Sequence, residues 1–491
     1  AQSIDAKGLV VSPGFIDIHS HSDTNILRDG LAQSKIRQGV TTEILGEGGS
    51  AAPSTGARAP RSLVIDGQIS RWSTFTEYFD LVDKQTTSVN IASYVGLSTV
   101  WQCVMGNSFA RPNETQFGKM ENLISTAMQQ GALGLSSQVM MPPGSLTTTD
   151  DLVRLAKVVA PFGGLYSTHI RNEGLGIFAS VNEAIAVGER AGIPVDIIHI
   201  KIADESNWGR MDEVVKLIEE ARIRGVDVQA NVYPYTRGNN NLISIIPPWA
   251  HEGGTKRLLE RLADSSDRKQ IHHDIINGVD DWYNHYTAVG GDWSRMLISG
   301  NHQFRGLTME RVFMLRGNPK DQIDDLLSIL QENGGGISTV FAHHTEKDMN
   351  FVLQKTWCSV GSDGSAYAIE GPLRVGNPHP RNFGTFPRVL GKYVRQQKLL
   401  SLEDAVRKMT SLNANKVGLK ERGLIKVGFA ADVVIFDADN IIDRSTYTAP
   451  FAYPVGIPYV VVNGKLTVIN GEHTGARAGV SLRKGVTPDT P

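Results

Sequence analysis

The stretch GFIDIHSHSD, residues 14–23, places two histidines directly after a run that is typical of a buried strand. Strand residues alternate between faces, so His19 and His21, two positions apart, point in the same direction. Neutral imidazole is a common ligand of zinc and related metals, so the pair indicates a metal site. Two hydrogen-bonded histidines in a polar layer are the alternative, and the rest of the chain has to decide.

The composition is that of a globular protein. The chain has 491 residues, of which 41% are hydrophobic and 20% charged, which is enough for a large core and more than one domain. The net charge of -2 gives no overall field that would recruit nucleic acid or an anionic membrane. Only two cysteines occur, Cys103 and Cys358, so a bound metal takes mainly histidine and carboxylate ligands.

The sequence predicts a soluble protein. It contains no run of about 18 apolar residues that would form a membrane helix. Its first residues lack the basic and apolar segments of a signal peptide. The compartment is left open: it is cytoplasmic or, if a signal peptide has been removed, periplasmic. We expect neither nucleic acid nor membrane as a partner, and a homo-oligomer is left open.

Short apolar runs alternate with amphipathic stretches along much of the chain. VNIASYVG (89–96) and GALGLSS (131–137) are typical of buried strands, and SVNEAIAVGERAG (180–192) has helical spacing and a final glycine. Repeated strand–helix alternation predicts parallel βαβ units. At this length a (β/α)8 barrel, the TIM-barrel fold, is the leading α/β architecture, and a doubly wound sheet is second.

Polar residues recur where the predicted strands end. In a parallel barrel these carboxyl ends face the active site, so the recurrence over five strands predicts a shared site. The residues are His19, His21, His169, His199, Lys201, Tyr233, Tyr235 and Asp363.

Two segments depart from the barrel pattern. Residues 239–340 form a long insertion, expected to be either a lid over the site or a surface subdomain. Its adjacent His272 and His273 point about 100° apart on a helix and are expected at the surface. After 414 the chain has hairpin patterns with glycine turns. We predict a remnant strand at 1–12, a barrel at 13–414, and a small β domain, a β-sandwich, with a tail at 415–491.

Several motifs together resemble one family. They are SPGFIDIHSHSD, GVTTEILGEGG, GALGLSS, YSTHIRNE, NVYPYT, GSDG, HPRNFGTFPRVLG and RGLIKVGFAADVVIFD. The chain resembles the amidohydrolase superfamily and, within it, the D-aminoacylases (N-acyl-D-amino-acid deacylases). The resemblance covers nearly the whole chain and is weakest in the insertion. It implies a metal-dependent hydrolase that acts on N-acyl-D-amino acids.

The resemblance assigns roles to residues of this sequence. It implies that His19, His21, His169, His199 and Asp363 bind metal. It implies that Lys201 and Arg381 hold the substrate carboxylate, and that Tyr233 or Tyr235 polarises the scissile carbonyl. Arg171 is a further candidate for substrate binding, with a structural salt bridge to Glu173 as its alternative. Internal salt bridges are also the alternative for Lys201 and Arg381.

One position departs from the family pattern. Typical members have GNCG where this chain has GEGG, so their cysteine ligand falls on Gly48. Gly48 has no side chain, and Glu47 is the nearest anion on the same turn, so we expect Glu47 to be a metal ligand. A role behind the ligands or in capping is the alternative. Cys103 follows a later strand and is a poor substitute.

The expected cofactor is one or two divalent ions, with Zn²⁺ favoured and Mn²⁺, Co²⁺ or Ni²⁺ open. Asp363 would carry the proton from water to the leaving amine, although an Asp-Gly turn is its alternative. His343 and His344 are expected behind the ligands or at the surface, with the alternative that one of them faces the pocket. The competing functions are another amidohydrolase, such as a dihydroorotase, a hydantoinase or an isoaspartyl dipeptidase-like enzyme, and a barrel without activity.

Overall fold

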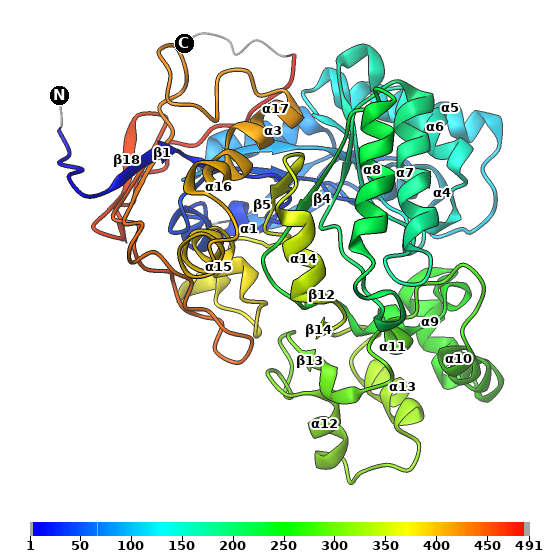
Figure 1. The fold of residues 1–491 in the computed structure, drawn as a ribbon. Helices are drawn as coiled ribbons and strands as arrows, with labels where there is room; N and C mark the ends of the chain where they lie inside the picture. Colours follow the sequence, from blue (N-terminus) through cyan, green and yellow to red (C-terminus); the bar gives the residue numbers. More distant parts are fainter. Residues whose placement is uncertain (1–2, 66, 486–491) are drawn as a thin grey trace.

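Eight parallel strands close into a barrel within residues 3–65 and 67–485, which a computed structural model of the protein describes (Figure 1). Strands that follow one another along the chain pair in parallel, and β6 and β7 are two halves of one strand interrupted at Tyr94. The barrel strands are β2 (Phe15–Asp17), β3 (Val40–Leu45), β6 (Asn90–Ser93), β7 (Val95–Gly96), β8 (Gly134–Gln138), β9 (Leu165–His169), β10 (Val195–Ile197), β11 (Val228–Val232) and β15 (Cys358–Val360).

The ring closes between the first and last of these strands. Ser20, after β2, forms a parallel bridge with Gly364, after β15. The Asp363 N–H donates a 2.8 Å hydrogen bond to the His19 carbonyl. The closure therefore joins the segments that carry His19, His21 and Asp363, which are far apart in the sequence. It confirms the (β/α)8 barrel over the doubly wound sheet.

Helices surround the barrel and begin at residues that suit helix starts. Thr74, Asn113 and Thr148 form capping boxes with the residues three positions on, which satisfy exposed N–H groups. The helices are α1 (Asn25–Arg28), α2 (Gln33–Ile36), α3 (Phe75–Gln85), α4 (Leu97–Met105), α5 (Glu114–Gln129), α6 (Thr149–Lys157), α7 (Ile177–Ala191), α8 (Met211–Ile223), α14 (Glu346–Leu353), α15 (Arg381–Arg388), α16 (Leu402–Met409) and α17 (Ser411–Val417). Among the described residues, no helix combines the length and the hydropathy that a membrane crossing needs.

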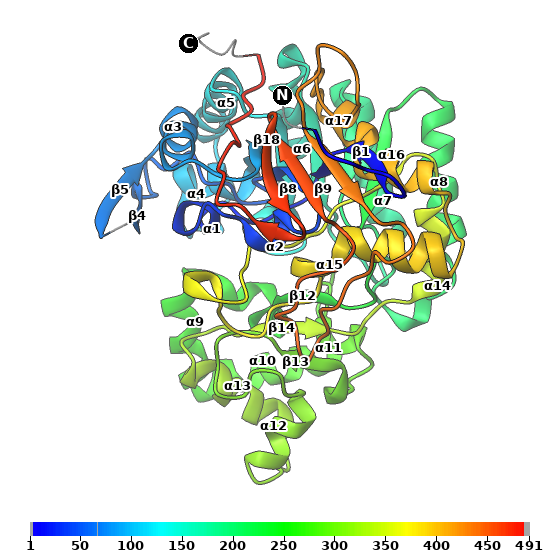
Figure 2. The same cartoon turned by 90° about the vertical axis from the view of Figure 1, so that its left-hand side faces the viewer.

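An inserted subdomain lies between β11 and α14, below the barrel in Figures 1 and 2. Its antiparallel sheet has the order β12–β14–β13, and its helices pack around a core of its own that includes Leu258, Phe313 and Phe341. Its elements are β12 (Gly238–Asn241), α9 (Gly254–Ala263), α10 (Ser265–Asn277), α11 (His285–Ala288), β13 (Met296–Ile298), α12 (Met309–Leu315), α13 (Gln322–Glu332) and β14 (Ser338–Phe341).

A separate antiparallel sheet joins the two ends of the chain, and Figure 2 shows it in front of the barrel. β1 (Val10–Pro13) pairs with the first of the late strands. The late strands are β16 (Val433–Phe436), β17 (Tyr459–Val462), β18 (Lys465–Ile469) and β19 (Glu472–His473). A separate hairpin of β4 (Arg61–Ile65) and β5 (Gln68–Trp72) projects away from this sheet, at the left of Figure 2.

The small β domain packs on the barrel with one sheet. Val434, Phe436 and Val460 belong to the same hydrophobic core as the barrel, and the Phe436 ring centroid lies 6.3 Å from that of Phe15. Among residues 3–65 and 67–485, the layer that packs against this sheet is the barrel, whereas in a sandwich it would be a second sheet. Residues 1, 2 and 486–491 of the predicted end segments lie outside the described residues.

Candidate metal centre and active-site cleft

Four histidines meet at the carboxyl ends of the barrel strands. His19 and His21 follow β2, His169 ends β9, and His199 follows β10. The ring centroid of His19 lies 5.0 Å from that of His21 and 5.2 Å from that of His199, while His169 and His199 are 4.5 Å apart. The carboxyl ends of three barrel strands thus place these side chains next to one another, as expected for a parallel barrel.

Asp363 lies between two of these histidines and an arginine. Its Oδ1 is 3.0 Å from Nε2 of His21 and 3.6 Å from Nε2 of His19, and its Oδ2 is 2.6 Å from Nη1 of Arg381. Burial alone would raise the pKa of this carboxyl, but Arg381 and the histidines hold that pKa well below its ordinary value. Asp363 is therefore a carboxylate and can ligate a cation.

Glu47 faces the same space from the loop after β3. Its Oε2 accepts a 3.1 Å hydrogen bond from Ser167, and it lines a cavity of about 370 Å³ together with all four histidines and Asp363. Burial raises the pKa of Glu47 well above its ordinary value in the absence of a cation. The structure thus directs Glu47 toward the histidines, where a cation would stabilise its charged form.

The residues present fit one or two divalent ions. Their candidate ligand atoms form two groups, each within 4.8 Å: His19, His21 and Asp363, and His169, Glu173 and His199. Both ring nitrogens of His19 and Oε1 of Glu47 are buried without a hydrogen-bond partner among the described residues. Buried polar atoms are normally paired, so these are atoms that await a ligand. Imidazole nitrogen with carboxylate oxygen suits zinc and its neighbours.

Backbone strain marks two of the site residues. His199 has a φ of 35° and Asp363 a φ of 50°, in the left-handed region that disfavours most side chains. Strained residues cluster at functional sites because the surroundings hold them there. Below Asp363, the fully buried Lys35 ammonium donates to Asp17 (2.7 Å), to Ser362 (2.9 Å) and to the Gly364 carbonyl (3.1 Å). This network fixes the turn that carries Asp363.

A second buried network supports His199. The Asn231 side chain accepts a 3.0 Å hydrogen bond from the His199 N–H and donates a 2.9 Å bond to Asp196. Asp196 in turn forms a 2.7 Å ion pair with the buried Lys416. The backbone of His199 is therefore held from inside the barrel.

Glu173 is a site residue that the sequence patterns did not reveal. Its Oε1 lies 2.5 Å from Nζ of Lys201 and 3.1 Å from Nδ1 of His199. Lys201 also lies 2.8 Å from His199 Nδ1 and donates a 3.0 Å bond to the His199 carbonyl. All three ammonium donors of Lys201 thus have internal partners, which favours the internal ion pair over a substrate contact. The available signal was the spacing of Glu173, four residues after His169.

The structure does not bring Arg171 to the cleft. Its guanidinium forms a two-pronged pair with Glu183, at 2.9 and 3.0 Å, and donates to the carbonyls of Ser145 and Thr147. The alternative interpretation of Arg171, a salt bridge with Glu173, is also wrong, because Arg171 turns outward to Glu183 on α7 while Glu173 turns inward to Lys201.

Of the two tyrosines, Tyr233 faces the cleft. It lines a cavity with His169, His199 and Lys201, and burial raises the pKa of its hydroxyl well above the ordinary value, so it remains a hydrogen-bond donor. Tyr235 instead points its hydroxyl toward Asp443, at 3.3 Å. The pair diverges because Pro234 lies between them, beyond the end of β11, where strand alternation no longer applies.

The other predicted histidines fall into two groups. His343 and His344 are 4% and 8% exposed, so neither lies at the surface. His343 lines the cleft beside Tyr233, and His344 bonds the Tyr235 carbonyl at 2.8 Å. His272 and His273 lie on α10, outside the cleft.

Three adjoining cavities form the cleft, and all three include Asp363, Asn239 and Asn240. The two asparagines belong to β12, so the inserted subdomain supplies part of the wall. One lobe, of about 530 Å³, extends past Arg381, and another, of about 370 Å³, extends past Glu47 and Gln138. The insertion therefore borders the site, which the sequence left open.

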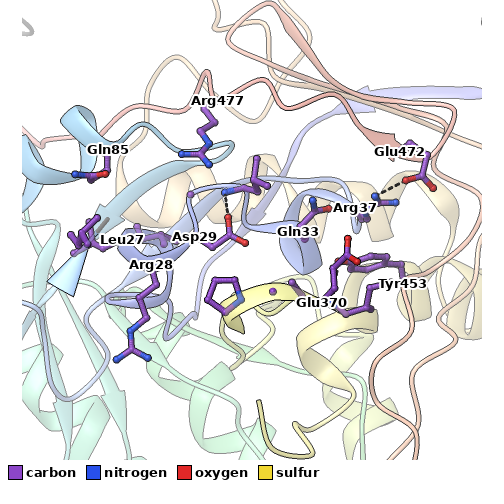
Figure 3. Close-up of a pocket in the computed structure, with 18 residues that line it drawn as sticks. Leu27, Arg28, Asp29, Gln33, Arg37, Gln85, Glu370, Tyr453, Glu472 and Arg477 are labelled. Atoms are coloured by element: carbon purple, nitrogen blue, oxygen red, sulfur yellow. Dashed lines mark hydrogen bonds and ion pairs between the residues drawn. The ribbon is translucent and has the colours of Figure 1, made fainter. Parts of the chain in front are cut away.

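Figure 3 shows another cavity, between the α1–α2 segment and the small β domain. It measures about 490 Å³ and contains Arg28, Asp29 and Glu370. Its Arg37 is paired with Glu472 at 2.7 Å, and a dashed line marks this pair. It shares no lining residue with the metal-site cleft, and the candidate metal ligands lie in that cleft.

Comparison with known proteins agrees with this geometry. The family model described as "Amidohydrolase family" matches residues 2–324 and 359–468. The chain belongs to the amidohydrolase family. This amidohydrolase is 33% identical over 484 residues to the D-aminoacylase of Alcaligenes xylosoxydans xylosoxydans, covering 98% of this chain and 89% of the relative. It is 32% identical over 464 residues to the N-acyl-D-glutamate deacylase of the same organism, covering 94% and 84%.

A solved structure gives the same grouping. The N-acyl-D-glutamate deacylase of Bordetella bronchiseptica, complexed with zinc and a phosphonate inhibitor, matches the amidohydrolase with a TM-score of 0.79 at 29% identity. The match covers 98% of this chain and 90% of that one. The predicted family and fold are thereby confirmed.

Proposed function

We propose that this amidohydrolase cleaves the amide bond of N-acyl-D-amino acids and releases a carboxylic acid and a D-amino acid. One observation carries the proposal: four imidazoles, Asp363 and Glu47 converge on one cleft with Arg381 at its edge. Relatives of about one-third identity that are named as D-amino-acid deacylases support the substrate class.

His19, His21 and Asp363 would hold metal on one side of the cleft, and His169, His199 and Glu47 on the other. A divalent ion held there would lower the pKa of bound water to about 7, so hydroxide would be available at neutral pH. Glu173 and Lys201 orient His199 from behind, in the way that carboxylates commonly orient ligand histidines.

Asp363 carries the proton through the reaction. Its carboxylate accepts a proton from the attacking water as the new C–O bond forms at the amide carbon. It then gives that proton to the nitrogen as the C–N bond breaks, because an amine leaves well only when protonated. The Tyr233 hydroxyl, protonated and facing the cleft, donates a hydrogen bond to the developing oxyanion.

Arg381 sets the orientation of the substrate. Its Nε is buried without a hydrogen-bond partner among the described residues, and its charge lies beside Asp363. A substrate α-carboxylate can pair with this guanidinium, in two-pronged geometry. The amino-acid half of the substrate then lies in the lobe past Arg381, and the acyl half lies in the lobe past Glu47.

The test is hydrolysis of matched N-acetyl-D- and N-acetyl-L-amino acids by the purified, zinc-loaded protein, with metal content measured on the same sample. We expect turnover of the D substrates and one or two ions per chain. Turnover of cyclic amides alone would favour a hydantoinase-like enzyme. Absence of both metal binding and turnover would favour a barrel without activity.

A further inference from the structure

The cleft lobe past Arg381 has a wall of amides and hydroxyls from the inserted subdomain. The register of its sheet places Asn241 opposite Ser338, and Ser299 follows β13 directly. The ends of β12, β14 and β13 therefore present neutral polar groups to the same lobe. These groups are Asn239, Asn240, Asn241, Ser299, Asn301 and Ser338.

The hydrogen bonds on this wall leave a donor free. The Asn239 amide oxygen lies 2.8 Å from the Ser299 hydroxyl and 3.3 Å from the Ser338 hydroxyl. The oxygen of Asn239 is thus engaged, while its Nδ2 has no hydrogen-bond partner in the described part of the chain. This amide can donate to an acceptor on a substrate in the lobe, and the two hydroxyls can accept from a donor.

The charges of the lobe leave one cation for the substrate. Its titratable side chains are His21, Asp363, Tyr367, His379 and Arg381, and burial raises the pKa of Tyr367, so that its hydroxyl stays uncharged. His379 is neutral, because its Nε2 donates to the Arg237 carbonyl at 2.9 Å and its Nδ1 accepts from the Arg381 N–H at 3.0 Å. His21 and Asp363 belong to the metal centre. Among the lining residues, Arg381 is therefore the positive charge available, and the α-carboxylate uses it.

We infer that the accepted D-amino acid has an uncharged, hydrogen-bonding side chain of the glutamine type, and that an acidic side chain is rejected. The inference rests on the proposed function and adds its substrate class. A second carboxylate would enter the lobe beside Asp363 without a cation to pair with. A carboxamide would accept from Asn239 and donate to Ser299 or Ser338. Sequence identity does not decide this point, because the D-aminoacylase and the N-acyl-D-glutamate deacylase are 33% and 32% identical to the chain.

The experiment compares kcat/KM of the zinc-loaded enzyme for N-acetyl-D-glutamine, N-acetyl-D-glutamate and N-acetyl-D-leucine. The first two have the same shape and differ in charge. We expect glutamine to exceed glutamate by about tenfold or more, as for an unpaired charge in a partly desolvated site, and also to exceed leucine. A preference for glutamate or for leucine overturns the inference alone. Failure to hydrolyse any N-acyl-D-amino acid overturns the proposed function, and the inference with it.

A charge-introducing variant tests the wall directly. Asn301 is exposed on the loop after β13, so Asn301→Arg places a cation at the lobe without disturbing a core. We expect the glutamate-to-glutamine ratio of kcat/KM to rise by about tenfold. Asn277→Arg, on the exposed end of α10 in the same subdomain, is the matched control and should leave the ratio unchanged. An unchanged ratio in a folded Asn301→Arg enzyme contradicts the placement of the substrate side chain in this lobe.

Discussion

Glu47 lies between two glycines, and their backbone conformation explains why no cysteine occupies position 48. Gly46 and Gly48 have φ values of 85° and 63°, which glycine adopts without strain. A β-carbon on Gly48 would lie 2.6 Å from Cβ of Gln138. The turn that directs Glu47 into the cleft therefore excludes a side chain at 48, and restoring a thiol there would distort the loop.

Replacing this carboxylate tests its role. In Glu47→Gln we expect metal affinity to fall by at least about 10–100-fold, because an uncharged amide is a weak ligand for a divalent cation. Metal content after dialysis against a weak chelator is the measurement. Ser167→Ala, which removes only the hydrogen bond to Glu47, is the control and should retain most of the metal. Full stoichiometry and activity in Glu47→Gln would show that Glu47 is not a ligand.

Asp363→Asn separates catalysis from folding. Asparagine, like aspartate, tolerates the positive φ of 50° at this position. We expect the fold to remain, while kcat falls by about 10²–10⁴-fold even when the variant is saturated with metal, because an amide cannot carry the proton to the amine. The measurement is kcat of the metal-loaded variant. A kcat within a few fold of wild type would remove Asp363 from the proton-transfer step.

At the scale of elements, the loops after β9 and β10 are joined by the ion pair of Glu173 with Lys201. We expect Lys201→Met to lower kcat/KM equally for an N-acyl-D-amino acid and for its C-terminal amide, because Lys201 orients His199. The unpaired Glu173 should also destabilise the fold by about 3–5 kcal/mol.

Arg381→Met is the matched comparison for Lys201→Met. It should lower kcat/KM for the free carboxylate substrate much more than for the amide. Kinetics of both variants on both substrates, with unfolding in urea for Lys201→Met, give the answer. A selective loss in Lys201→Met would return that residue to the substrate carboxylate.

The sequence predicted the barrel and most of the side chains that meet in the cleft because their signals are local. An apolar run followed by a histidine at the strand end marks His19, His169 and His199 as candidate site residues. This signal does not depend on how the rest of the chain folds. Glu173 was missed because a glutamate in a loop is usually solvated, and its burial depends on Lys201 from the next strand. The direction of Arg171 likewise depended on Glu183, a residue on a helix whose packing no local pattern reveals.

The inserted subdomain was harder to place for a different reason. Its strands are short, and Asn239 and Asn240 look like turn residues in isolation. Their position at the cleft follows from the order β12–β14–β13, which pairs segments nearly 100 residues apart. Long-range antiparallel pairing leaves little trace in local periodicity, so its role as a wall of the site emerged only from the structure.

At the scale of the whole molecule, the metal-free protein buries histidines that prefer to be neutral. Burial lowers the pKa of His169 to about 4 and that of His285 and His344 to about 3, against 6.5 in an unfolded chain. The unfolded chain then binds more protons below pH 6.5. Stability should be complete above pH 6.5 and fall as the pH drops toward 4, by up to about 1.4 kcal/mol per pH unit for each histidine.

Urea unfolding with a chelator between pH 7.5 and pH 4 measures this loss. His285→Gln should reduce the slope, whereas His273→Gln, with a side chain that is 66% exposed, should leave it unchanged. A free energy of unfolding that stays constant between pH 6.5 and pH 4 would contradict the buried, neutral state of these residues.

The independent core of the inserted subdomain bears on how such an enzyme can diversify. The candidate metal ligands lie at the carboxyl ends of the barrel strands, whereas the amide and hydroxyl wall lies on a sheet with its own packing around Phe313 and Phe341. Mutations that reshape the wall can accumulate without disturbing the residues that perform the reaction. Proteins that descend from one ancestral barrel could therefore keep the same reaction. Selection on the insertion would then change which D-amino acids each of them accepts.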